Sequence, residues 1–258
     1  MLTASMPATL PYERWYRHFL DNRDALASLP WHDSYRLSEA ERTAVGPSIQ
    51  QFQLGEWARG RGFKRRAAST PGLGADPWFL PALDLFIAEE QGHSGMLGRF
   101  LDREGIPRLA HDWLDSAFRR LRKLAGLEIC AAVLVTAEVL AMPFYQALRD
   151  ATRSRLLRAI CVHILRDESA HLNYQALTLG LVRRSLSESA RMLHSAVHSA
   201  LFLGTALLVW QQHRRTFRAA GWTFRRFWND ARHWFALLEV KIRGASVGAE
   251  SFDDLRLD

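Results

Sequence analysis

The sequence predicts an all-α protein built around a bundle of four long helices. Apolar residues recur at helical spacing over most of the 258 residues, with little of the alternation typical of strands. Proline and glycine separate these segments at "PGLGADP" (71–77) and "GIP" (105–107), and "DATRS" (150–154) is a weaker break. Hydrophobic residues make up 48% of the chain, which is enough to fill a core.

We expect a single domain, 1–258, with three parts. The four-helix core covers about 38–185, and additional helices follow at about 187–243. The segment 1–37 contains three prolines and is expected to be an irregular arm that ends in one or two short helices.

Each core helix is expected to turn one apolar face inward, and one glutamate interrupts each of these faces. The helices are expected at about 38–66, 77–104, 125–150 and 154–184, and the glutamates are Glu56, Glu90, Glu138 and Glu168. An ionised carboxylate in an apolar core is costly unless a cation or a hydrogen-bond partner compensates it. Four of them in one core therefore indicate a bound cation.

Two of these glutamates are followed three residues later by a histidine. His93 follows Glu90 in "AEEQGHS", and His171 follows Glu168 in "RDESAHL". Residues i and i+3 lie on the same face of a helix, so each carboxylate and imidazole can bind the same metal. One such pair usually marks a solvated salt-bridging face, but here both pairs lie within apolar faces.

The turns predict that the four glutamates lie at one level of the bundle. Position 73, inside "PGLGADP", is midway between Glu56 and Glu90, and position 153, inside "DATRS", is midway between Glu138 and Glu168. Residues equidistant from a turn face each other in an antiparallel hairpin. Glu128 competes with Glu138, but its pairing with Glu168 would centre the turn at 148, inside a helical segment. Four carboxylates and two histidines are the ligand set for a pair of iron or manganese ions.

The segments "AEEQGHSGMLGRFL" and "ILRDESAHLNYQAL" resemble the paired EExxH and DExxH segments of the ferritin-like di-iron carboxylate superfamily. Acyl-carrier-protein desaturases, ribonucleotide reductase small subunits, di-iron oxygenases, rubrerythrins and ferritins belong to it. The resemblance covers about 40–185 and implies a ferritin-like four-helix bundle with a dinuclear site. The metal ligands that it implies are Glu56, Glu90, His93, Glu138, Glu168 and His171. It also implies that the four glutamates among them take part in catalysis.

A histidine that binds a metal usually donates its other N–H to a carboxylate. Asp167 is expected to serve His93 across the bundle, and Glu89 is expected to serve His171. Both could instead be ordinary charged residues beside the apolar face.

An apolar substrate pocket is expected beside the metals. Its wall is predicted near Phe52, Phe86, Met142 and Ile164, and Pro143 is expected to bend its helix there.

Some superfamily features are missing. Leu97 stands where the reductase subunits have their radical-forming tyrosine, which argues against a stored radical of that type. Cys130 and Cys161 cannot supply the cysteine-ligated iron of rubrerythrins and are expected to be core thiols.

The resemblance implies an O₂-dependent oxidase or oxygenase with two iron ions, or manganese or a mixed manganese–iron pair. The chain has no dinucleotide fingerprint or iron–sulfur cysteines, so electrons should come from an external ferredoxin or reductase. The organic substrate is a small molecule or is bound to a carrier. Hydroxylation, desaturation, N-oxygenation and oxidative cleavage all remain open.

Two other functions remain open at this stage. One is a ferroxidase, iron-binding or peroxide-scavenging protein without an organic substrate. The other is a helical protein of this fold that binds no metal.

The chain carries a net charge of +7, concentrated in "RGRGFKRR" and "HRRTFRAAGWTFRRF". No nucleic-acid motif accompanies the charge, so no specific nucleic acid is expected, and an acidic electron donor or carrier protein fits better. We also expect a homodimer.

The N-terminus lacks the pattern of a secretory signal, and two cysteines agree with a reducing compartment, so a cytoplasmic location is expected. The apolar segment 196–210 is shorter than the roughly 20 residues that span a bilayer. We expect it to pack as a fifth helix on the bundle, with peripheral membrane contact through "HRRTFR" and Trp222 as the alternative.

Overall fold

The computed structural model describes residues 11–24, 29–57, 61–70, 73–111 and 126–247, and these residues form helices and no strand. The helices are α1 (Pro11–Asp24), α2 (Glu39–Gly55), α3 (Arg61–Ala68), α4 (Phe79–Arg103), α6 (Leu127–Asp150), α7 (Arg155–Arg184), α8 (Glu188–Ala219) and α9 (Phe224–Val247). The predicted all-α class is confirmed.

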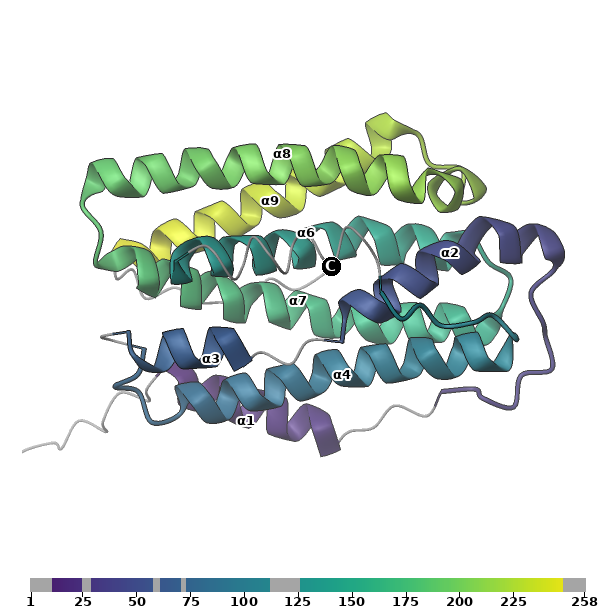
Figure 1. The fold of residues 1–258 in the computed structure, drawn as a ribbon, viewed down its shortest axis with the longest axis horizontal. Coiled ribbons are helices and arrows are strands. Elements are labelled where there is room, and N and C mark those ends of the chain that lie inside the picture. The colour runs from purple at the N-terminus through teal and green to yellow at the C-terminus, as the bar shows by residue number, and fades with distance from the viewer. Residues whose placement is uncertain (1–10, 25–28, 58–60, 71–72, 112–125, 248–258) are drawn as a thin grey trace, which may run out of the picture.

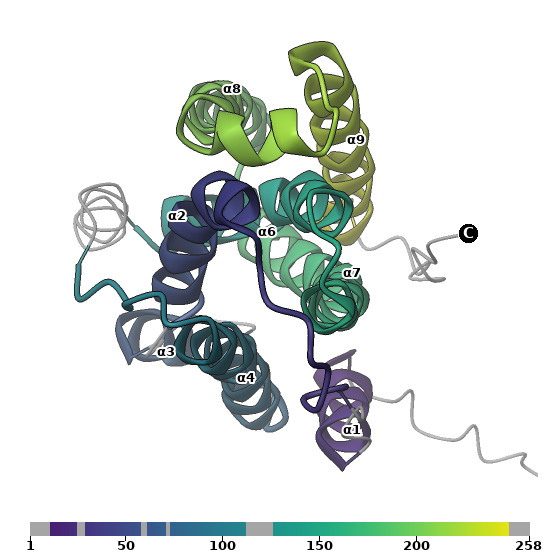
Figure 2. The same ribbon diagram turned by 90° about the vertical axis from the view of Figure 1, so that its right-hand side faces the viewer.

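The helices form a bundle-like arrangement of layers (Figures 1 and 2). The helices α2, α6 and α7 lie in the middle, and α6 packs along α7. On one side α8 and α9 cover α6 and α7. On the other side α4 packs against α2 and α7, and α1 packs against α4. The helices that carry the predicted glutamates therefore pack together, α4 on α2 and α7, and α6 on α7.

The prediction of one continuous helix over 38–66 is wrong, because α2 ends at Gly55 and α3 is a separate helix. The sequence "GEWARGRG" (55–62) contains three glycines, which are unfavourable in a helix interior. Glu56 is the C-cap residue of α2, and its backbone N–H donates to Phe52 O. Glu56 thus enters the site from a helix end rather than from the middle of a helix.

The predicted hairpin of α6 and α7 has its turn at 151–154, where "DATRS" predicted it. Ser154 caps α7 by accepting a hydrogen bond from the backbone N–H of Leu157. Glu41 of α2 accepts from the backbone N–H of Arg153 and so ties this turn to α2. The helix α6 continues through Pro143 as one helix.

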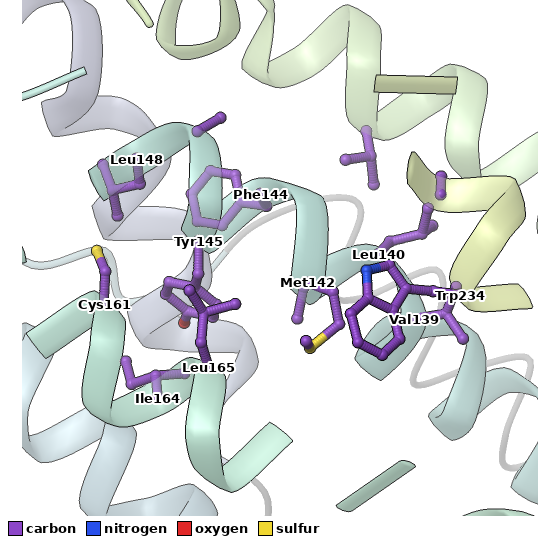
Figure 3. Close-up of a cluster of buried hydrophobic side chains, with 14 of the residues drawn as sticks. Val139, Leu140, Met142, Phe144, Tyr145, Leu148, Cys161, Ile164, Leu165 and Trp234 are labelled. Atoms are coloured by element: carbon purple, nitrogen blue, oxygen red, sulfur yellow. The ribbon is translucent and has the colours of Figure 1, made fainter. Parts of the chain in front are cut away.

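Two apolar clusters make up the core. The larger one joins α2, α4, α6, α7, α8 and α9, and the smaller one joins α1 to the first half of α4 and the second half of α7. Figure 3 shows part of the larger cluster, where Phe144 and Tyr145 of α6 gather with Cys161 and Ile164 of α7. Both cysteines are buried and form no disulfide, in agreement with the expected core thiols.

The C-terminal helices are held by polar contacts as well as by apolar packing. Buried Arg183 of α7 donates to Glu128 of α6, at 2.8 Å, and lies 3.7 Å from Glu239 of α9. His194 of α8 contacts the other oxygen of Glu128 at 2.6 Å, and His198 of α8 contacts Glu239 at 2.7 Å. These two histidines connect α8 to both carboxylates.

Among the described residues, two helices are long and apolar enough to cross a membrane by length and composition alone, α6 and α8. The apolar window of α6 is 78% buried, as in the core helix of a bundle, whereas that of α8 is only 28% buried. An 18-residue window of α8 passes this test, although the apolar segment 196–210 is itself shorter than a bilayer span. Its buried side nevertheless packs on the protein.

Candidate metal centre

The two ExxH pairs meet in the middle of the molecule, between α4 and α7. Glu90 and His93 face Glu168 and His171, and one ligand atom from each lies within 4.8 Å of the other three. All four side chains are buried. The i, i+3 spacing puts each pair on one face of its helix, and the packing of α4 on α7 brings the two faces together. This group could hold a metal ion.

The inward atoms of this group make no hydrogen bond to any described residue. They are Glu90 Oε1, His93 Nδ1, both carboxylate oxygens of Glu168 and His171 Nδ1. The closest approach is 2.8 Å, between Glu90 Oε1 and His171 Nδ1, without hydrogen-bond geometry. Buried polar atoms are nearly always hydrogen-bonded, so five such atoms in one place need another partner. Carboxylate and imidazole donors together suit iron, manganese or zinc.

The outward nitrogen of each histidine contacts a carboxylate of the opposite helix. His93 Nε2 of α4 lies 3.1 Å from Asp167 Oδ2 of α7, and His171 Nε2 of α7 lies 2.9 Å from Glu89 Oε2 of α4. The two contacts are the cross-bundle pairs that the sequence suggested. When Nε2 donates its proton to these carboxylates, the Nδ1 lone pair faces the inward group.

Glu56 and Glu138 complete the cluster from the other two helices. Glu138 of α6 has one oxygen 3.8 Å from His171 Nδ1, and Glu56 makes a side-chain contact with Glu90. The structure thus brings together all six side chains that the sequence singled out. Glu128, the competing carboxylate of α6, contacts Arg183 and His194 instead.

Two residues that the sequence did not single out for this purpose hold these outer glutamates. The phenol of Tyr145 donates a 2.6 Å hydrogen bond to Glu56 Oε1, and the amide of Gln175 donates one of 2.6 Å to Glu138 Oε1. Each contact occupies one carboxylate oxygen and leaves the second for another partner. Gln175 follows His171 by four residues, so its place on the same helix face was visible in the sequence.

The helix α1 also contributes to the centre, which the sequence gave no reason to expect. Asn22 Nδ2 lies 2.6 Å from Glu89 Oε1 and 3.2 Å from Asp167 Oδ1. Arg166 donates to both Asn22 Oδ1 and Asp167 Oδ1. One amide therefore joins the two carboxylates that support the histidines.

Burial and mutual repulsion dominate the electrostatics of the carboxylates. Burial, reinforced by the charge of Glu138, raises the pKa of Glu90 and of Glu168 well above the ordinary range. Burial also raises the pKa of Glu56, against the opposing effects of His93 and Tyr145. Burial acts in the same direction on Glu138, but contacts with Glu168, His171 and Gln175 outweigh it and lower its pKa. Without a cation, the cluster must retain protons to remain buried.

Burial and the neighbouring carboxylates act in opposite directions on the pKa of each histidine. Burial lowers the pKa of His171, but its contacts with Glu138, Glu168, Glu89 and Glu90 outweigh burial and raise the pKa well above the usual value. For His93 the contact with Asp167 similarly outweighs burial and raises the pKa. The protein surroundings are thus strongly negative, which favours a cation.

The four residues expected in a pocket wall divide between the two apolar clusters. Phe86 belongs to the smaller apolar cluster and contacts the ring of His171, with centroids 4.6 Å apart. Phe52 stacks on Phe144, on the side of the larger cluster. Met142 and Ile164 are fully buried in that same cluster (Figure 3). Phe86 alone among them touches a histidine of the centre in the contacts described.

Comparison with protein-family models, with curated proteins and with solved structures finds no match for this chain.

Proposed function

We propose that this chain is a non-haem di-metal oxidoreductase with a ferritin-like core, and that it uses O₂ and external electrons to oxidise an organic substrate. The observation that carries the proposal is the group of five inward atoms without hydrogen bonds, contributed by Glu90, His93, Glu168 and His171. In a dry, closely packed interior such atoms are costly unless they bind a cation.

The residues present fit two metal ions better than one. Four carboxylates and two imidazoles, one histidine for each ion, match the ligand set of dinuclear sites in helical bundles. Glu168 lies 3.6 Å from Nδ1 of both histidines, and Glu90 lies 2.8 Å from that of His171, so these four side chains, together with Glu56 and Glu138, would hold the ions. The absence of cysteine from the cluster favours iron or manganese.

The chemistry that the bound ions would supply is the binding of O₂ and the delivery of electrons to it in pairs. The protein orients both imidazoles through Asp167 and Glu89, and it holds one oxygen of Glu56 and one of Glu138 through Tyr145 and Gln175.

The surroundings of the centre suit reactive oxygen chemistry, because they exclude bulk water. Phe19 and Phe86 pack on the ring of His171, and Tyr145 is fully buried. A dry site protects reactive species from side reactions with water. Electrons would come from a separate ferredoxin or reductase, for which the basic surface offers complementary charge.

The test is the metal content of the purified full chain after anaerobic loading with Fe²⁺ or Mn²⁺. We expect about two ions per chain. Glu138→Ala and His171→Ala should each lose at least one ion, whereas the matched surface variants Glu188→Ala and His233→Ala should keep both. Wild-type protein that stays metal-free under these conditions would refute the proposal.

A second measurement separates the oxidase from a ferroxidase. The loaded protein is mixed with O₂ and a reductant, and O₂ uptake is followed with and without a panel of organic substrates. Repeated uptake that depends on an organic compound supports the proposal. Uptake that is proportional to added Fe²⁺ alone, with release of ferric mineral, would assign the centre to iron oxidation instead.

A further inference from the structure

The helix α8 has an exposed apolar side that no described part of the chain covers. Six of the eleven exposed large hydrophobic residues lie on this helix: Met192, Leu193, Val197, Leu203, Leu207 and Leu208. Met192 and Leu193 are 69% and 64% exposed, values that are unusual for adjacent apolar residues on a helix. Figures 1 and 2 place α8 at the outer edge of the molecule.

The exposed side is continuous and uncharged. Ala196, Ala200 and Gly204 lie exposed between the large residues, and no Asp, Glu, Lys or Arg occurs from Met192 to His213. These side chains cover about half of the helix circumference over 17 residues, or roughly 25 Å. The opposite side packs on the protein through buried residues that include His198, Phe202 and His213. The helix is therefore held parallel to the protein surface and is not free to span a bilayer.

Exposed arginines follow the apolar stretch on the same side of α8. Arg214, Arg215 and Arg218 are exposed, follow at helical spacing, and form no ion pair with a described residue. Arg225 and Arg226 are exposed at the start of α9, beside the same end of α8.

Aromatic rings gather at the same end. Phe224 is 40% exposed, and its ring packs against Trp210 with centroids 5.4 Å apart. An apolar helix side followed by arginine and partly exposed aromatic residues is typical of helices that lie in the membrane–water interface.

We propose that the exposed side of α8, with the arginines at the α8–α9 turn, docks this protein on an anionic lipid membrane, with α8 parallel to the membrane plane. The apolar side chains from Met192 to Leu208 enter the boundary between headgroups and acyl chains, and the arginines bind lipid phosphates. This inference is independent of the metal centre.

A second copy of the chain fits the charges less well. In a parallel pair of α8 helices the arginines would face one another. In an antiparallel pair they would face the first turn of the other copy, where Glu188 is accompanied by Arg184 and Arg191. Both arrangements bring like charges together, whereas anionic phosphates compensate every arginine.

The experiment is co-sedimentation of the full chain with phosphatidylcholine vesicles, with and without about one third phosphatidylglycerol. We expect binding to the anionic vesicles and at least tenfold weaker binding to the neutral ones. Leu203→Glu/Leu207→Glu should abolish binding. Val162→Glu, at a 54% exposed apolar position on α7, is the matched control and should bind as wild type does.

A second variant tests the basic end. Arg214→Gln/Arg215→Gln/Arg218→Gln should weaken partitioning onto anionic vesicles about 100-fold, since each basic residue near such a surface contributes about fivefold. Added salt should reduce wild-type binding. All these positions are exposed, so unchanged circular dichroism and melting temperature verify the fold of each variant.

Two outcomes would overturn the proposal. One is the absence of binding to anionic vesicles, or binding that survives both variants. The other is a wild-type dimer in light scattering that becomes monomeric in Leu203→Glu/Leu207→Glu while vesicles remain unbound. That result would assign the apolar side to a second copy of the chain.

Discussion

Asn22 of α1 donates from Nδ2 to Glu89 Oε1 of α4, over 2.6 Å, and the same amide nitrogen lies 3.2 Å from Asp167 Oδ1 of α7. Because Glu89 contacts His171 and Asp167 contacts His93, one side chain outside α2, α4, α6 and α7 supports both histidines. Docking of α1 and the geometry of the centre are thereby linked.

The first prediction concerns Asn22→Ala. Removal of the amide frees both carboxylates, so we expect metal affinity to fall about 10- to 100-fold, as for other residues that orient metal ligands indirectly. The affinity is measured anaerobically by competition with a chelator. Asn229→Ala, at an exposed position of α9, is the matched control and should leave affinity unchanged. A melting temperature of the metal-free variant close to that of wild type separates this effect from a loss of folding, and an unaltered affinity would contradict the role of Asn22.

The second prediction concerns pH. The pKa values of Glu90 and Glu168 are raised by burial and by Glu138, and contacts with neighbouring carboxylates raise that of His171. A raised folded-state pKa stabilises the protein below the unfolded pKa, and this contribution is lost as pH rises toward the folded pKa. The metal-free protein should therefore lose stability as the pH rises above the ordinary carboxyl value of 4.5.

Metal binding should reverse this trend, because the ions displace the protons from these groups. The difference in melting temperature between the loaded and metal-free protein is expected to increase over the same pH range. Asp167 and Glu138 have lowered pKa values, so their contributions change below the ordinary carboxyl pKa, outside this window. Differential scanning calorimetry of both forms provides the measurement, and a difference that stays constant with pH would contradict the expectation.

The third prediction concerns Arg183, whose buried guanidinium compensates Glu128 and Glu239. Arg183→Ala leaves these carboxylates without their cation and should cost about 3–5 kcal/mol in the free energy of unfolding. Arg183→Met combined with Glu128→Met should recover most of that loss, since an apolar replacement of a buried pair is often neutral. Urea denaturation measures both, with exposed Arg184→Ala as the control. Equal losses in the single and double variants would argue against the pairing.

The fourth prediction tests the contact between α7 and α9 at Gly180. A Cβ atom there would lie 2.8 Å from the carbonyl oxygen of Ile242 and would overlap the side chain of Ala245. Gly180→Ala should therefore destabilise the protein by about 1–3 kcal/mol, because α9 must shift. A Cβ atom at Gly244, also on α9, would meet no atom within 4 Å, so Gly244→Ala should be neutral or stabilising. Thermal unfolding compares the two, and equal effects would contradict the close approach.

The sequence alone was sufficient to predict that these six carboxylate and histidine side chains lie together, because each is defined by local rules. The i, i+3 spacing puts Glu90 with His93, and the symmetry about two turns relates Glu56 to Glu90 and Glu138 to Glu168. The periodicity did not predict that α2 ends before Glu56. The relation still holds, because Glu56 is the C-cap residue that directly follows the last residue of α2.

Tertiary structure alone decided which residues other than Asp167 and Glu89 support this centre. Asn22 is 67 positions from Glu89 and 145 from Asp167, and Tyr145 is 89 positions from Glu56, so no local pattern relates them. The orientation of α8 was also undetermined, because both of its sides are apolar. Phe202 and Leu203 are neighbours of similar hydrophobicity, yet one is 4% and the other 47% exposed. The burial of each side chain depends on which side of α8 the partner helices cover. The spacing of apolar residues cannot predict that side when both sides of a helix are apolar.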